Sequence, residues 1–139
     1  MDNLFHDCAS LKKINISNFN TEKVIKMESM FQNCKNFKEI NLNDFYTPSL
    51  RQMYNLFSGC TSVTEIKIPQ FDTFQVTNFA NLFYDSNSLK SIDISKIFVT
   101  NMATNMSRMF CNCNTLKKID LSDLNTKRVT DMNSLFKGC

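Results

Sequence analysis

A repeat of 26 residues runs through this 139-residue chain and constrains its fold more than any other feature. Its clearest marker is a phenylalanine that recurs at intervals of 26, 26, 26, 27 and 26 residues: Phe5, Phe31, Phe57, Phe83, Phe110 and Phe136. A cysteine follows three residues after each marker, except that Ser86 stands in the fourth place. Units of equal length stack, because each buries its apolar face only against its neighbours. Residues 1–139 are therefore predicted to form one repeat domain with about five repeats.

Each unit contains a short segment in which apolar and polar residues alternate. In the first unit it is LKKINIS, residues 11–17, and in the second it is FKEINLN, residues 37–43. The alternation places Ile14 and Ile16 on one side of the chain and Asn15 on the other, as in a half-buried β-strand. A strand this short is stable only beside the equivalent strands of neighbouring units, so the sequence predicts a sheet of short parallel strands.

A second segment of each unit has the spacing of a short helix. Val24, Met27 and Met30 lie three residues apart, and residues spaced in this way share one face of a helix. Thr21, which recurs in every unit, suits a helix N-cap or a turn bond to nearby backbone N–H groups. Asn33 occupies a position that holds only Asp, Asn or Gly, which tolerate the left-handed conformation at a helix end. The prediction is a helix that ends at this position.

Stacking these units in register predicts a curved molecule with two kinds of face. Strands in a sheet lie about 4.7–4.9 Å apart, whereas a helix with its side chains is about 10 Å wide. The helical side must therefore spread more than the sheet. The expected fold has short parallel β-strands on the concave face and short helices on the convex face.

The unit Lxx[IL]x[IL]S-x-F-x-T-x-x-V-x-x-M-x-x-[ML]F-x-x-C resembles the leucine-rich repeat of BspA-type surface proteins, in its Met-Phe-Cys variety. The resemblance covers essentially all of residues 1–139, with Phe79 in place of the usual Met as one departure. It implies an α/β leucine-rich-repeat solenoid, displayed at the cell surface, that adheres to host or extracellular-matrix proteins or binds proteins more generally. A cell-surface or extracellular location depends on the resemblance alone, because no signal or anchor is recognisable in these residues.

The charge and the residue inventory argue against several classes of function. The 16 Lys and Arg residues are interleaved with 13 Asp and Glu residues, so no strongly basic surface for nucleic acid is expected. No apolar run is long enough to cross a bilayer. The single histidine, His6, has no recognisable partner for nucleophilic or metal chemistry. The prediction is a protein that is not an enzyme and uses neither a metal nor a cofactor.

Polar residues of the alternating segments form the candidate binding face, on the predicted concave side. They recur just before and within the expected strands: Lys12, Lys13, Asn15, Lys38, Glu39, Asn41, Glu65, Lys67, Lys90, Asp93, Lys117, Lys118 and Asp120. The recurring lysines favour an acidic protein partner. The carboxylates among them favour a solvated face without a ligand, so both interpretations stay open.

The six cysteines are predicted to be structural, because those of the repeat column are too widely spaced for a zinc site and free cysteine packs as a small apolar residue. Cys111 is the exception. Its equivalents in other units include His6 and Lys137, which are typical of an exposed position. Cys111 is therefore the candidate exposed thiol, either idle or reactive.

The favoured function is a non-enzymatic repeat scaffold that binds a protein partner, of unpredicted identity, through the concave face. Surface adhesion to a host or matrix protein is the version that the resemblance implies. The alternative is a purely structural spacer or assembly component that associates through its ends. Neither end has a polar capping unit, so further repeats, a flanking domain or end-to-end self-association is expected to cover the apolar edges.

Overall fold

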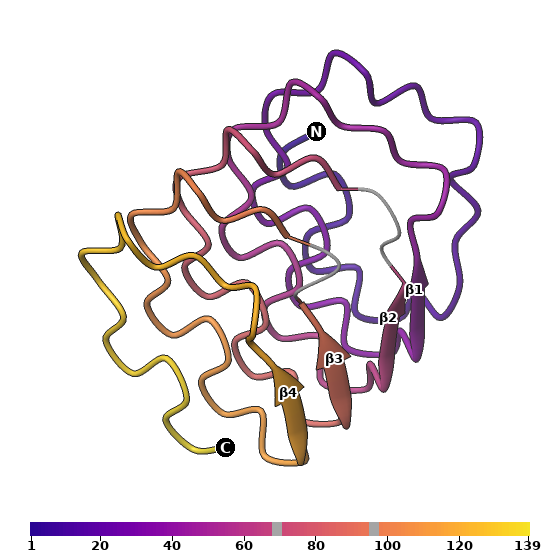
Figure 1. Ribbon diagram of the computed structural model, residues 1–139. Helices are drawn as coiled ribbons and strands as arrows, with labels where there is room; N and C mark the ends of the chain where they lie inside the picture. Colours follow the sequence, from indigo (N-terminus) through magenta and orange to yellow (C-terminus); the bar gives the residue numbers. More distant parts are fainter. Residues whose placement is uncertain (68–70, 95–97) are drawn as a thin grey trace.

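The computed structural model describes residues 1–67, 71–94 and 98–139, without the side chains of Lys67 and Asp93. Four strands of three residues each lie in this part of the chain: β1 (Glu39–Asn41), β2 (Glu65–Lys67), β3 (Ser91–Asp93) and β4 (Lys118–Asp120). Each strand lies in the alternating segment of its repeat. The repeats stack in chain order, and the strands follow one another along one side of the stack, which we call the strand face (Figure 1).

The strands form two separate parallel sheets of two strands each. β1 pairs with β2, with Ile40 opposite Ile66, and β3 pairs with β4, with Ile92 opposite Ile119. In the first repeat, residues 11–17 have the same alternation but form no strand. β1 is consequently an edge strand, because β2 is its only partner within the sheet.

The described residues contain no α-helix, so the prediction of an α/β leucine-rich-repeat solenoid with helices on its convex face is wrong. Residues 28–33, at the end of the predicted helix, form consecutive turns instead. Ser29 and Asn33 have φ angles of 53° and 60°, which a right-handed helix does not contain. Turns of the same kind recur in each repeat, and we call these stretches the turn segments: 1–8, 27–34, 53–60, 79–86, 106–113 and 132–139.

The directions of the backbone N–H groups explain why no helix forms. In a helix each N–H donates to the carbonyl four residues earlier. Here the N–H groups of Gln32 and Cys34 donate to carbonyls three residues earlier, both at 3.1 Å. Those of Ser29, Phe31 and Asn33 instead donate to the next turn segment, at 3.1, 3.0 and 2.8 Å. We call the bonds between turn segments the turn ladder, and they make the backbone of one repeat depend on its neighbour.

Two columns of residues with a left-handed backbone run along the turn segments. One is the position predicted to end a helix: Asp7, Asn33, Gly59, Asp85, Asn112 and Gly138. The other has no counterpart among the predictions: Asn3, Ser29, Asn55, Asn81, Arg108 and Ser134. The prediction for the column of Asn33 was therefore right about the left-handed conformation and wrong about the helix, because left-handed residues also occur in consecutive turns.

A recurring threonine joins the loops of adjacent repeats. The Thr73 hydroxyl donates to the Val99 carbonyl at 3.0 Å and accepts from the Val99 N–H at 2.7 Å. The same two bonds join Thr21 to Tyr46 and Thr100 to Asn125. Thr47 is also buried, but its hydroxyl has no partner in the described part of the chain. We call this pair of bonds the threonine clamp, and it takes the place of the predicted N-cap.

The core consists of columns in which the same side chain is repeated. The rings of the phenylalanine column stack, with centroids of neighbours 5.3 to 5.9 Å apart. From the second repeat onward, the thiol of the column cysteine donates to the phenylalanine carbonyl one repeat earlier, as Cys60 does to Phe31 at 3.2 Å. Ser86 makes the same bond to Phe57 at 3.3 Å, so serine replaces cysteine there without loss of the donor.

Candidate binding groove on the strand face

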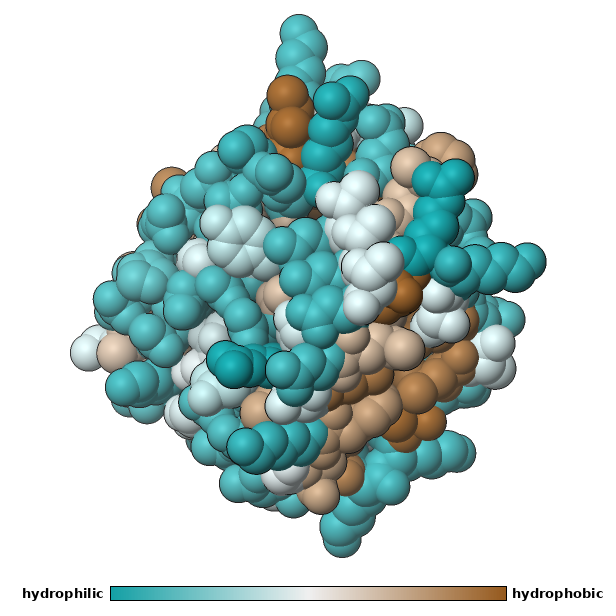
Figure 2. Space-filling view, turned by 90° about the vertical axis from the view of Figure 1, so that its left-hand side faces the viewer, coloured by the Kyte–Doolittle hydropathy of each residue, from teal (hydrophilic) through white to brown (hydrophobic). Residues whose placement is uncertain are grey.

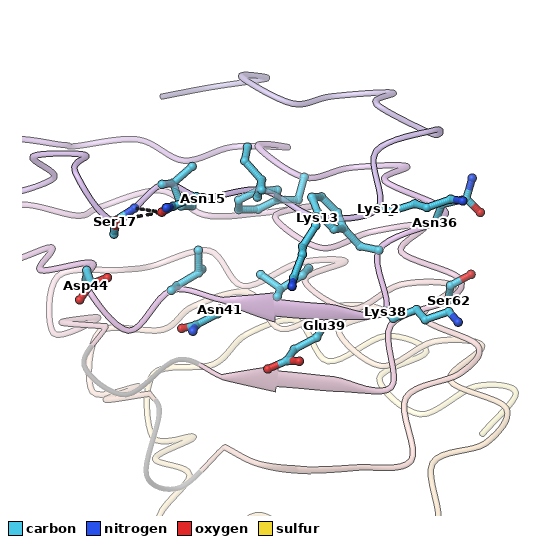
Figure 3. Close-up of a pocket in the computed structure, with 16 residues that line it drawn as sticks. Lys12, Lys13, Asn15, Ser17, Asn36, Lys38, Glu39, Asn41, Asp44 and Ser62 are labelled. Carbon is cyan, nitrogen blue, oxygen red and sulfur yellow. Dashed lines mark hydrogen bonds between the residues drawn. The ribbon is translucent and has the colours of Figure 1, made fainter.

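A groove with a volume of about 800 Å³ lies on the strand face between residues 12–17 and β1 (Figure 3). Lys12, Lys13, Asn15 and Ser17 border it on the side of the first repeat, and β1 borders it on the other. The groove exists because residues 11–17 form no strand beside β1. One side of the groove is therefore the outer edge of a β-strand.

The floor of the groove is apolar and rigid. It includes side chains that belong to the molecular core: Ile16, Phe31, Phe37, Ile40 and Leu42. Phe31 is fully buried and Ile40 is 3% exposed, so these residues are fixed by packing from below. The floor is therefore preformed, and its side chains present little area to a ligand, with Ile16 5% and Ile40 3% exposed.

Charged side chains stand along the rim of the groove. Lys12, Lys13 and Lys38 are exposed, and no ion pair of these lysines is found among the described residues. Lys12 and Lys38 lie near one end of the groove, whereas Asp44 lies near the other end (Figure 3). Glu39 of β1 also lines the groove. The rim thus has three ammonium groups and two carboxylates, which favours an acidic ligand at the lysine end.

Three of the predicted binding residues close turns with their side chains. Asn15 Oδ1 accepts from the Ser17 N–H at 3.1 Å and from its hydroxyl at 2.8 Å. Asn41 Oδ1 accepts from the Asn43 N–H at 3.0 Å. At the same position of the last strand, Asp120 Oδ1 accepts from the Ser122 N–H at 2.9 Å. These side chains end the alternating segments, because such a bond imitates a backbone turn.

The structure brings six of the predicted binding residues together in the groove: Lys12, Lys13, Asn15, Lys38, Glu39 and Asn41. Others lie farther along the stack, on or beside β2, β3 and β4, and the described side chains among them are exposed: Glu65, Lys90, Lys117, Lys118 and Asp120. The side chains of Lys67 and Asp93 lie outside the described part of the structure. Sequence reasoning missed Ser17, Asn36, Asp44 and Ser62, which also line the groove. Asn36 and Ser62 occupy the same position of successive repeats, but that position lies before the expected strand and was interpreted only as a lead-in to it.

Cys111 is not the exposed thiol that its column predicts. It is 5% exposed, and its equivalent Ser58 is buried to the same extent, whereas the equivalents Gln32 and Tyr84 are partly exposed. All six cysteines are free, with Cys8 partly exposed and Cys139 exposed. Burial raises the pKa of the Cys34 and Cys113 thiols to about 12, so these thiols stay protonated and unreactive at neutral pH.

The described residues also bear on metal binding and on membrane insertion. They contain no group of three or more His, Cys, Asp or Glu side chains arranged to hold a metal ion. They also contain no helix with the length and apolar character that a membrane span requires. The groove is the candidate functional site.

The fold and the groove together define a class: a repeat protein whose described residues contain no helix and whose stacked units are joined by short parallel strands and a turn ladder. Its 26-residue repeat, carried through the whole chain, also allows an assignment by sequence. The chain belongs to the family described as Mycoplasma protein of unknown function, DUF285, which matches residues 1–114 and 40–139. No curated protein and no solved structure matches the chain.

Proposed function

We propose that this protein is a non-enzymatic repeat scaffold that binds a partner protein on its strand face. The occupant of the groove is an extended, acidic segment of that partner. The resemblance to BspA-type repeats supports protein binding, and adhesion to a host or matrix protein is the version we favour. The single observation that carries the proposal is the groove between residues 12–17 and β1.

An extended segment fits the groove because of its strand edge. A strand at the edge of a sheet presents backbone groups that a peptide can pair with, and β-strand addition is a common way to bind extended peptides. Alternate side chains of the added strand would point to the apolar floor, where Ile40 and Leu42 lie. The other side chains would face the rim. This geometry selects a segment in which apolar and acidic residues alternate.

The lysines of the rim contribute to affinity and to partner choice. An exposed ion pair contributes about 0.2–1 kcal/mol to the free energy of binding. Reversing the charges of Lys12 and Lys38 removes two such pairs and adds repulsion, so it should cost about 1–2 kcal/mol in total. Because about 1.4 kcal/mol corresponds to a factor of ten, reversing both charges should weaken binding about tenfold. The effect should shrink as salt is added, since both lysines are exposed.

The test uses a short fluorescent peptide of alternating glutamate and valine, with binding measured by fluorescence anisotropy. Lys12→Glu combined with Lys38→Glu should weaken binding. The matched control combines Lys90→Glu with Lys117→Glu, which makes the same charge change at exposed positions outside the groove. Equal losses in the two double variants would reject the groove as the site.

A second arm tests the strand edge itself. The same peptide with alternate backbone amides methylated keeps its charges but cannot pair with β1. We expect this peptide to lose binding. Binding that survives methylation would show that the lysines attract the peptide without strand addition, and the proposed mode of binding would then be wrong.

A further inference from the structure

Large apolar side chains are exposed on the inner repeats of the stack, although hydrophilic residues cover most of the side that Figure 2 shows. Tyr46, Phe74 and Val99 are 57%, 56% and 45% exposed. They belong to the second, third and fourth repeats, each of which has a neighbouring repeat on both sides. Their exposure therefore does not depend on where the sequence begins or ends.

The recurring threonine sets the direction of the residues on either side of it. Thr73 is buried, whereas Asp72 before it and Phe74 after it are both exposed. The same alternation occurs around the equivalent threonines of the second and fourth repeats, so the two flanking residues point outward together. We call the exposed or partly exposed residues at these positions the clamp array: Tyr46, Pro48, Asp72, Phe74, Val99 and Asn101.

Contacts between adjacent repeats make the clamp array one continuous surface. The rings of Phe45 and Phe71, directly before the array, stack with centroids 6.3 Å apart and hold the loops of the second and third repeats side by side. The threonine clamp between Thr73 and Val99 does the same for the third and fourth repeats. Phe74 therefore lies in the middle repeat of the surface.

Opposite charges lie on the two sides of Phe74. Asp72 Oδ1 accepts from the Phe74 N–H at 3.1 Å, which holds the carboxylate on one side. Arg51 Nε donates at 3.2 Å to Oε1 of Gln75, the next residue along the chain, which holds the guanidinium on the other side. Both charged side chains are exposed, and neither has an ion pair in the described part of the chain. The surface thus has an apolar centre between an anion and a cation.

We propose that the clamp array binds the clamp array of a second copy, around a two-fold axis that runs along the stack through the column of Phe74. Such an axis exchanges the two sides of the column. Asp72 of each copy then faces Arg51 of the other, and the two Phe74 rings meet at the centre. Val99 of each copy faces Met102 of the other, a partly exposed apolar residue in the column of Gln75.

The charge pattern favours a second copy over other occupants. A partner with charge of one sign would meet a like charge on one side of Phe74, whereas the two-fold arrangement pairs both charges of both copies. The contact is small, since a standard interface uses roughly 20–30 residues on each side. The dimer should therefore be weak and form at high protein concentration. The interface goes beyond the proposed groove, because none of its residues lines that groove.

The experiment reverses the two charges separately and follows association by sedimentation equilibrium over a range of concentrations. The unchanged protein should show an equilibrium between monomer and dimer. Asp72→Arg and Arg51→Asp each place like charges opposite each other at both contacts, so each should raise the dissociation constant of the dimer about tenfold. An equimolar mixture of the two variants should form dimers as tightly as the unchanged protein, because every arginine then faces an aspartate.

The mixture separates the proposed contact from local damage, since a distorted loop would not be rescued by the second variant. A mixture no tighter than the single variants would show that Asp72 and Arg51 do not face each other. A monomer at every concentration for the unchanged protein would overturn the proposal, as would species that continue beyond the dimer.

Two further variants test the centre of the interface and the effect of net charge. Phe74→Glu should abolish the dimer, and circular dichroism checks that the fold is kept, as the exposure of Phe74 predicts. Lys117→Asp is the matched control, because it makes the same charge change as Arg51→Asp at an exposed position beside β4. It should dimerise like the unchanged protein. An equal loss in this control would show that net charge, and not the clamp array, governs association.

Discussion

Replacing Gly59 by alanine should destabilise the protein, because this buried position has no room for a Cβ atom. Gly59 has a φ of 70°, and a Cβ atom built on it meets the Oδ1 of Asn33. Asn33 is held in place because its amide donates to Asp7 at 2.8 Å. The alanine methyl group therefore forces either the backbone of residue 59 or the side chain of Asn33 to move.

The expected cost follows from these two contacts. A left-handed conformation costs a residue with a Cβ about 1–2 kcal/mol relative to glycine. Displacing Asn33 removes a hydrogen bond that contributes about 0.5–1.5 kcal/mol. Gly59→Ala should therefore lower the free energy of unfolding by about 1.5–3.5 kcal/mol, the sum of these two ranges.

A double-mutant cycle tests this prediction, with the free energy of unfolding of each variant measured in urea. Asn33→Gly removes the obstructing side chain and keeps a residue that accepts a φ of 60°. The double variant should be no less stable than Gly59→Ala alone, so the two changes should not be additive. Additive losses, or a Gly59→Ala variant as stable as the unchanged protein, would show that Asn33 and Gly59 do not constrain each other.

Three further predictions concern side chains of the core. Thr73→Val should cost about 1–2 kcal/mol because both bonds of its threonine clamp are lost. Thr47→Val should be nearly neutral in the same urea assay, since the Thr47 hydroxyl has no partner among the described residues. Burial raises the pKa of the Cys34 thiol from 9.0 to about 12, so the unfolded chain ionises this thiol first. Stability measured by urea unfolding should fall as pH rises from about 9 towards 12, and Cys34→Ser should remove part of that fall. In native-state thiol labelling followed by mass spectrometry, Cys139 should react before Cys111; the reverse order would contradict the burial of Cys111.

The alternating segments show how far sequence reasoning reaches. Alternation in FKEINLN marks the position of β1, because side-chain direction in a strand depends on a period of two. The same alternation in LKKINIS produces no strand. Whether a segment pairs with its neighbour depends on how the repeats pack, which the pattern does not contain. The groove between these two segments was therefore beyond prediction, although six of its residues were identified.

The helix prediction failed for a different physical reason. Met27, Met30 and Phe31 share one face in consecutive turns much as they do in a helix, so their spacing does not separate the two conformations. The distinction lies in the left-handed residues Ser29 and Asn33 and in the N–H groups that leave the segment. The Asp, Asn or Gly at position 33 was visible in the sequence. The equivalents of Ser29 include Asn3, Asn55 and Asn81, and asparagine also tolerates the left-handed conformation, so this column carried a signal that sequence reasoning missed.

The threonine clamp has a consequence for how such chains can vary in length. The interval between Phe83 and Phe110 is one residue longer than the others, and the extra residue falls between Ile94 and Thr100. Thr73 nevertheless makes both of its bonds with Val99, the residue directly before the next clamp threonine. The clamp therefore keeps the repeats after the extra residue in register with those before it, and the core columns continue past that point. A stretch bounded in this way is a natural site for lengthening, where evolution or an engineer can add a loop without rephasing the rest of the array.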